Sequence, residues 1–238
     1  MRIGRRRECS ICGARVRRFE PHRGRSDAKC PHCGALERHR AIWLYLQRRT
    51  DLFTAPRRVL HFAPERGISQ RLSELPNLDY TTCDLAPGRA MRVIDATEID
   101  LPNRSVDVVF CAHVLEHVPD DRRAMRELRR ILADDGWALI QVPVLGAVTD
   151  EDPSVTDPDE RLARFGQEDH VRAYGEDVYT RLAAAGFSVD LVDVRDVVTA
   201  DERERYGLDA HAQGVDPEHR HLWEIPICRP VEPSPSRG

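Results

Sequence analysis

Between residues 57 and 145, short runs rich in β-branched residues alternate with segments of helical periodicity. The runs at 58–63, 80–84, 92–95, 106–112 and 137–144 predict strands, and the segments at 69–75 and 120–132 predict amphipathic helices. Strands interleaved with helices at this spacing are typical of a parallel sheet covered by helices on both faces. The predicted fold class is therefore α/β.

The alternation is interrupted once and then resumes. Residues 146–175 are polar and rich in acids, and this stretch is too long for a simple connection, which is typical of a lid or a substrate loop. A helix and a strand are predicted over 176–194, and a last strand over 221–229. The tail after it is rich in proline and serine, so we expect it to be disordered.

Four of the seven cysteines form two C-x2-C pairs, each followed by glycine. Such a pair can bind one ion through both thiolates, and the glycine permits the tight turn beneath the sulfurs. With no export signal in view, we expect a cytoplasmic location, where thiols stay reduced. Four thiolates leave no open position for water, so a structural Zn²⁺ is predicted rather than a catalytic one. The predicted ligands are Cys9, Cys12, Cys30 and Cys33.

Residues 1–34 contain few apolar side chains, so the metal has to organise this module. A tetrathiolate zinc site supplies about 10–16 kcal/mol in small peptides, which is comparable to the whole net stability of a domain. The other three cysteines stand in apolar strand-like segments and are interpreted as buried free thiols.

Charge is distributed unevenly along the chain. Residues 1–50 hold 14 Lys and Arg against 4 Asp and Glu, whereas residues 51–238 hold 22 against 36. Such a split indicates two parts that face different partners. We expect a zinc ribbon and a linking helix over 1–50, a catalytic domain over 51–229 and a disordered tail over 230–238. No apolar run approaches 18 residues, so no membrane contact is predicted.

Five blocks of the sequence resemble a known family. They are VLHFAPERG (59–67), CDLAPG (83–88), IDATEIDLP (94–102), the long block at 107–143 that contains HVLEHV, and LAAAGF (182–187). The chain resembles the class I, seven-stranded, Rossmann-like methyltransferases that use S-adenosylmethionine (SAM), in the bacterial branch with Leu-Glu-His after the fourth strand. The resemblance implies a strand order of 3-2-1-4-5-7-6, with the seventh strand antiparallel.

The resemblance also implies a SAM site at the ends of the first four strands. The family has Asp-x-Gly-x-Gly-x-Gly after its first strand, and this chain departs from it, with only the last glycine kept. We interpret this as a variant loop, in which Glu65 accepts hydrogen bonds from the ammonium group of SAM; the rival interpretation is a lost site. Asp84 matches the ribose-binding carboxylate and Asp95 the adenine-binding position, with a helix N-cap and a turn aspartate as their rivals. The implied cofactor residues are His61, Ala63, Glu65, Gly67, Asp84, Leu85, Asp95, Ala96 and Ala112.

The acceptor side is predicted from two segments. Methyl transfer needs alignment, and a base only where the acceptor loses a proton. His113 leaves the fourth strand where acceptors sit in this fold and is the first candidate base, with a backbone-bonded histidine as the rival. If 169–174 is extended, its alternate side chains share one side, and Asp169 can fix the tautomer of His170; the rival is a solvated loop. The predicted catalytic residues are His113, His170 and Tyr174, and the predicted substrate-binding residues are Glu116, His117 and Arg172.

Three functions are compatible with these patterns. The first is methyl transfer to O or N of a small metabolite or natural-product scaffold. The second is an RNA methyltransferase whose basic ribbon binds phosphates; the acidic catalytic part and the absence of an Asn/Asp-Pro-Pro-aromatic motif count against it. The third is a non-catalytic SAM-binding scaffold. The sequence carries no signal for an oligomeric state.

Overall fold

The computed structural model describes residues 7–208 and 224–231 and contains a seven-stranded sheet. Its order is β13-β14-β9-β8-β5-β6-β7, and β14 runs antiparallel to both of its neighbours while the other pairs are parallel. This confirms the predicted order and the antiparallel seventh strand. The bounds are β5 (Arg57–Phe62), β6 (Leu78–Asp84), β7 (Arg92–Val93), β8 (Val106–Ala112), β9 (Leu132–Gln141), β13 (Phe187–Asp193) and β14 (Glu224–Pro230).

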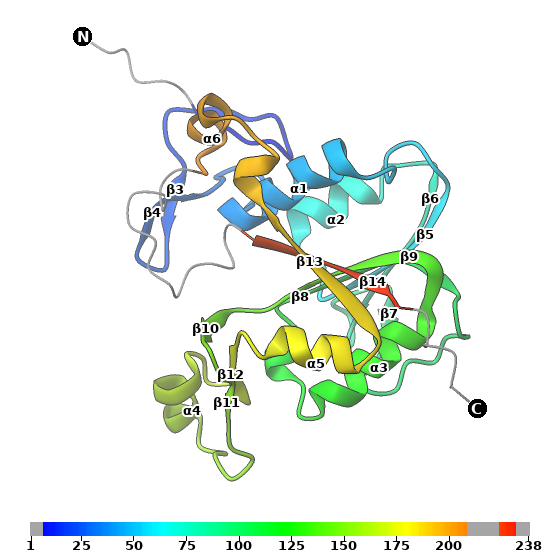
Figure 1. Cartoon of the computed structure of the whole chain (residues 1–238). Helices are drawn as coiled ribbons and strands as arrows, with labels where there is room; N and C mark the ends of the chain where they lie inside the picture. The colour runs from blue at the N-terminus through cyan, green and yellow to red at the C-terminus, as the bar shows by residue number, and fades with distance from the viewer. Residues whose placement is uncertain (1–6, 209–223, 232–238) are drawn as a thin grey trace.

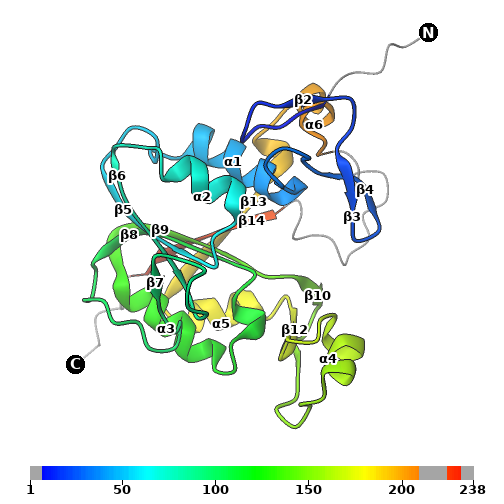
Figure 2. The same cartoon turned by 180° about the vertical axis from the view of Figure 1, so that it is seen from behind.

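Helices cover both faces of the sheet (Figures 1 and 2). On one face lie α1 (Glu37–Arg49) and α2 (Arg66–Leu72), and on the other α3 (Asp121–Ile131) and α5 (Val178–Ala184). In α3 the side chain of Asp120 accepts a hydrogen bond from the backbone N–H of Arg123 at 2.9 Å, which caps the helix. Its apolar residues at helical spacing, Ala124, Met125, Leu128 and Ile131, are all buried.

The polar segment 146–175 is an ordered unit rather than a simple loop. It contains most of a three-stranded sheet of order β10-β12-β11, made of β10 (Val144–Gly146), β11 (Asp150–Glu151) and β12 (Arg172–Gly175), together with α4 (Pro158–Phe165). Asp157 caps α4, proline occupies its first turn, and Gly166 ends it with φ 88°. Figure 1 shows this unit projecting beyond the end of the main sheet. We call residues 144–175 the insertion.

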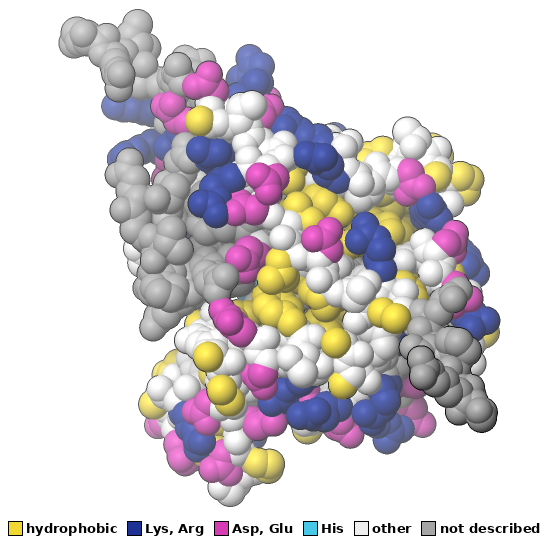
Figure 3. Space-filling view, viewed as in Figure 1, with side chains coloured by type: hydrophobic (Ala, Val, Ile, Leu, Met, Phe, Trp, Pro, Cys, Tyr) yellow, Lys and Arg dark blue, Asp and Glu magenta, His cyan; other side chains and the backbone are white. Residues whose placement is uncertain are grey.

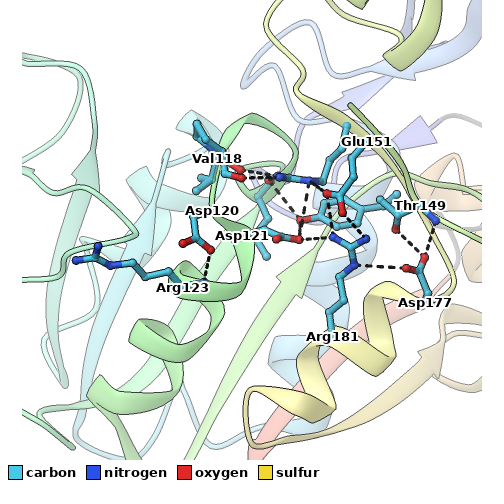
Figure 4. Close-up of polar contacts among 12 residues, drawn as sticks. Val118, Asp120, Asp121, Arg123, Thr149, Glu151, Asp177 and Arg181 are labelled. Carbon is cyan, nitrogen blue, oxygen red and sulfur yellow. Dashed lines mark hydrogen bonds and ion pairs between the residues drawn. The ribbon is translucent and has the colours of Figure 1, made fainter. Parts of the chain in front are cut away.

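A buried network joins the insertion to the helices (Figure 4). The guanidinium of Arg181 lies 3.1 Å from the carboxylate of Asp121, 3.0 Å from that of Glu151 and 3.4 Å from that of Asp177. Arg181 therefore connects α3, β11 and the start of α5, and its buried charge is balanced by three carboxylates.

The N-terminal module consists of two hairpins that pack on α1. They are β1 (Arg7–Glu8) with β2 (Arg15–Val16), and β3 (Glu20–His22) with β4 (Arg25–Lys29). Ile11 and Phe19 belong to the same buried apolar cluster as Val59 and Phe110 of the sheet. The remaining elements are the short η1 (Leu115–His117) and η2 (Val194–Asp196), and α6 (Ala200–Tyr206), which lies beside β1.

Further sequence predictions concern the surface charge, membrane-spanning helices and the C-terminal end of the chain. Figure 3 shows basic and acidic side chains interspersed over the upper part of the molecule, further basic ones over the region of α3 and α5, and mostly acidic ones among the charged side chains of the insertion. No helix in the described part of the chain is long and apolar enough to cross a membrane. Most of the tail predicted to be disordered, 232–238, lies outside the described residues, as do residues 221–223 of the last predicted strand.

Candidate functional site

The four cysteines of the C-x2-C pairs meet at one point. Their sulfur atoms all lie within 4.8 Å of one another, with 3.6 Å between Cys9 and Cys33 and 3.8 Å between Cys12 and Cys30. Four sulfurs bound to one Zn²⁺ at about 2.3 Å would lie roughly 3.8 Å apart. A disulfide would need about 2.05 Å, and all four thiols are free. The cluster therefore fits a tetrahedral zinc ion.

The two pairs form matching turns. The N–H of Gly13 donates to the carbonyl of Cys9 at 2.8 Å, and the N–H of Gly34 donates to that of Cys30 at 2.9 Å. Both glycines have positive φ, 71° and 76°, which side chains rarely adopt. The glycine after each pair is thus required by the turn beneath the sulfurs.

A cavity of about 590 Å³ opens at the carboxyl ends of β5, β6 and β8. This volume is typical of sites for ligands of cofactor size, and the carboxyl edge of an open α/β sheet is where such ligands bind. Asp84 and Asp95 line it, and each uses Oδ1 to accept the backbone N–H two residues on, at 2.8 and 2.7 Å. These turns hold both carboxylates at the rim. We call this space the cofactor cavity.

The loop after β5 makes contacts that a glycine-rich loop, which has no side chains, could not make. Ala63 lines the cofactor cavity with a positive φ of 44°, a backbone conformation that costs a non-glycine residue roughly 1–2 kcal/mol. Glu65 turns away from the cavity. Its Oε2 lies 2.8 Å from Nε2 of His61, and its Oε1 lies 3.7 Å from Nε2 of His39 in α1. Burial lowers the pKa of His39 to about 3, so this imidazole is neutral at neutral pH.

A second cavity, of about 490 Å³, lies between the insertion and the β3–β4 hairpin. The hairpin contributes His22, Arg23 and Arg25, and α1 contributes Arg38. Arg25 is partly neutralised by Glu37 at 3.2 Å. The basic side chains outnumber the acidic ones on this wall, and this favours an anionic or oxygen-rich occupant. We call this space the acceptor cavity.

The two cavities meet at the turn after β8. His113 and His117 line both of them. His113 has a positive φ of 55°, and its Nδ1 lies 3.1 Å from Oε1 of the buried Glu116. Strain of this kind persists only where surrounding contacts hold it, and it is concentrated at functional sites.

The insertion holds this turn in place. The guanidinium of Arg172, which is 4% exposed, donates to the carbonyls of Leu115 at 2.9 Å and Pro119 at 2.8 Å. The N–H of Val171 donates to the carbonyl of Glu116 at 2.9 Å. Hydrogen bonds from the insertion thus fix the turn that lines both cavities.

Comparisons with known proteins agree with this architecture. Residues 68–140 match the family model described as a methyltransferase domain. The solved structures that resemble the chain include the cyclase SpnF, with 14% identity, a TM-score of 0.54 and coverage of 90% of this chain and 87% of that one. They also include phosphoethanolamine N-methyltransferase 2 of Haemonchus contortus in complex with S-adenosyl-L-methionine, with 16% identity, a TM-score of 0.51 and coverage of 81% and 52%. No curated protein matches.

The chain has the Rossmann-like methyltransferase fold. The methyltransferase model matches the segment from α2 to β9, which includes the acids of the cofactor cavity and the Leu-Glu-His turn. At these identities the solved structures show the fold alone, and one of them is named a cyclase. The reaction must therefore be argued from the site.

The methyltransferase fold brings part of the predicted cofactor set together. Ala63, Asp84, Leu85, Asp95 and Ala96 line the cofactor cavity. His61, Glu65 and Gly67 are not among its lining residues, and the space beside Gly67 is filled by the carbonyl and the sulfur of Cys33. Ala112 is buried at the end of β8, beside the cavity-lining His113.

The predicted acceptor residues gather around the acceptor cavity, but with other partners than expected. His113, Glu116, His117, His170, Arg172 and Tyr174 all line it. The expected pairing of Asp169 with His170 is wrong: Asp169 lies 3.3 Å from Nδ1 of His117, while Nδ1 of His170 donates to the carbonyl of Phe165 at 2.9 Å. The hydroxyl of Tyr174 donates to Asp121 at 2.7 Å, and burial raises the pKa of Tyr174 well above its usual range. The side chains of Tyr174 and Arg172 therefore hold the turn after β8 in place.

The sequence did not predict that the N-terminal module contributes residues to the candidate site. The β3–β4 hairpin forms a wall of the acceptor cavity, and His39 reaches the loop after β5. The basic sequence HRGR at 22–25, between the two cysteine pairs, could have indicated that this module contacts an anionic ligand. Its position over the cavity is set by tertiary packing, which the local sequence does not report.

Proposed function

We propose that the chain is a SAM-dependent methyltransferase that transfers a methyl group to an oxygen or nitrogen of a small metabolite or natural-product scaffold. The observation that carries this proposal is the junction of the two cavities at His113 and His117. A sulfonium methyl delivered from one cavity meets an acceptor held in the other, and such positioning supplies much of the acceleration of a displacement reaction. The SAM-bound Haemonchus contortus enzyme of the same fold supports the choice of cofactor.

The residues of the cofactor cavity fit SAM. Asp84 ends β6, and its carboxylate can accept hydrogen bonds from both ribose hydroxyls. Asp95 and Ala96 line the same cavity and are proposed to contact the adenine. Ala63 gives the β5 loop a positive φ, a backbone conformation that glycine adopts readily. When bound, the cofactor supplies the electrophilic methyl; the chain itself binds, aligns and shields the reactants.

The acceptor is proposed to carry negative charge or several oxygen atoms. Arg23, Arg25 and Arg38 face a cavity of about 490 Å³, which suits a molecule of metabolite size. Nε of Arg38 is buried without a hydrogen-bond partner in the described part of the chain, and an anionic acceptor group would satisfy it. His113, between the cavities, is the proposed base for acceptors that lose a proton.

The ribbon is proposed to hold a structural Zn²⁺ through Cys9, Cys12, Cys30 and Cys33, because the four sulfurs already have near-tetrahedral spacing. It positions the β3–β4 hairpin over the acceptor. Cytoplasmic residence remains our expectation.

An RNA methyltransferase is the second candidate, and the basic hairpin at the acceptor cavity favours it. Incubating the protein with an extract and SAM labelled in its methyl group separates the candidates. We expect label in the small-molecule fraction and none in RNA or protein. Label confined to RNA would transfer the proposal to the second candidate, and label in no fraction, with an extract shown to contain acceptors by a second methyltransferase, would refute both.

A further inference from the structure

A second group of metal-binding side chains lies apart from the cysteine cluster. One ligand atom each from Glu116, His117 and His170 lies within 4.8 Å of the other two. All three residues line the acceptor cavity, and His117 also lines the cofactor cavity. The group is therefore placed where the methyl group and its acceptor would meet.

Two atoms of this group are buried without a hydrogen-bond partner. Oε2 of Glu116 and Nε2 of His170 have none among the residues that the structure describes, although these residues are only 1% and 5% exposed. A buried carboxylate oxygen and a buried imidazole nitrogen without partners cost several kcal/mol unless something satisfies both. A cation between them does so.

In His117 and His170 the nitrogen Nδ1 contacts an oxygen atom, as the second ring nitrogen of a metal-binding histidine does. Nδ1 of His170 donates to the carbonyl of Phe165 at 2.9 Å, which leaves Nε2 with its lone pair. Nδ1 of His117 lies 3.3 Å from the carboxylate of Asp169, which leaves its Nε2 available as a ligand atom. Metal-bound histidines almost always donate the second nitrogen to a carbonyl or a carboxylate, which fixes the tautomer and the ring orientation.

We propose that Glu116, His117 and His170 bind a divalent transition-metal ion of the Zn²⁺ or Fe²⁺ class at the junction of the two cavities. Two imidazoles and one carboxylate suit these ions, and three protein ligands leave coordination positions open to the acceptor. Metal–ligand bonds of about 2.1 Å place neighbouring ligand atoms roughly 3–3.5 Å apart. Binding the ion therefore draws the three atoms together by no more than about 2 Å, and the half-exposed His117 has room to move.

The role of the ion rests on the proposed function. An acceptor hydroxyl bound at an open position would lose its proton to His113 more readily, because the cation would stabilise the oxygen anion. That oxygen forms a bond to the methyl carbon as the carbon–sulfur bond breaks, and the sulfonium becomes the neutral thioether of S-adenosylhomocysteine. The site thus favours acceptors that bind metals through oxygen.

Calorimetric titration of Zn²⁺ into the full chain, purified with its ribbon zinc and free of SAM, tests the site. We expect one further ion to bind per chain, and at least a tenfold loss of affinity in His117→Ala and in His170→Ala. His22→Ala, which changes another histidine of the same cavity, should bind as the wild type does. Mg²⁺ should not compete, because imidazole ligands disfavour it.

Three outcomes overturn the proposal: no ion beyond the ribbon zinc, unchanged binding in both triad variants, or an equal loss in His22→Ala. Glu116→Gln keeps the side-chain volume and removes the charge, so it reports on binding if an alanine variant unfolds. A parallel titration with S-adenosylhomocysteine separates this proposal from the proposed function. If the nucleoside binds and the ion does not, only the metal site falls; if the ion binds and the nucleoside does not, only the methyltransferase falls.

Discussion

The guanidinium of Arg40 lies 3.9 Å above the ring of Phe19, and it is completely buried. It donates to the carbonyls of Ala28 at 2.8 Å and Ala35 at 2.9 Å in the ribbon. It also donates to the carbonyls of Tyr206 and Gly207 at the end of α6, at 2.7 and 3.1 Å. One cation therefore fastens the N-terminal cysteine module to α6 of the main fold.

Arg40→Lys should weaken this attachment strongly. A lysine keeps the charge but cannot reach four carbonyls with a planar fork or stack on Phe19 in the same way. We expect a loss of about 3 kcal/mol, which lowers the melting temperature by about 6–12 °C in a domain of this size. Thermal unfolding with Arg18→Lys as the control, an exposed arginine beside Phe19, measures the difference. Equal melting temperatures for the two variants would refute the role of Arg40.

The thiolate site should contain zinc without any added metal. Metal analysis of the purified protein should find at least one ion per chain, and Cys30→Ser should lower the content by about one and reduce solubility, because the ribbon has little core without it. Cys83→Ser changes a cysteine that is equally buried but far from the cluster in sequence, so its metal content should equal that of the wild type. Well-folded protein without metal would contradict the structural zinc.

Ala63 offers a steric test of the cofactor cavity. Its side chain lines the cavity at a positive φ, so Ala63→Leu should fill the space that the methionine part of SAM needs. We expect at least a tenfold loss of affinity for S-adenosylhomocysteine, with a small change in melting temperature. Ala63→Gly adds no volume and suits the backbone, so its affinity should stay within about twofold of the wild type. Full affinity in Ala63→Leu would place the cofactor elsewhere.

His113 should act on the acceptor rather than on the cofactor. Asparagine tolerates positive φ, so His113→Asn removes the imidazole while keeping the strained turn. We expect nearly unchanged affinity for S-adenosylhomocysteine and a rate of transfer about 10²- to 10⁴-fold lower, the range of a general base. His32→Asn, in the ribbon and exposed, is the control. A loss of less than tenfold would give His113 a positioning role only.

The strands followed from local pattern, because β-branched runs such as Val106 to Ala112 predict strands directly. Asp84 and Asp95 were assigned to the cofactor from the resemblance. The strand order came from the resemblance. The insertion was expected as a loop, since strands of two to four residues are too short for a periodic signal. Glu65 and Gly67 were assigned to the cofactor from their place in a motif. In the structure Glu65 contacts His61 and His39 instead, and Gly67 lies against Cys33. The docking of the N-terminal part of the chain decides what fills the space beside this loop, and local sequence does not report such docking.

Binding of S-adenosylhomocysteine to the purified chain tests the central claim most directly. Calorimetry should find one molecule bound per chain, and Asp84→Ala should weaken binding by about 1–3 kcal/mol, because two ribose hydroxyls lose a charged acceptor. Asp79→Ala, an exposed aspartate earlier on the same strand, should bind as the wild type does. No binding by the folded wild-type chain, or equal binding by Asp84→Ala, would contradict the account.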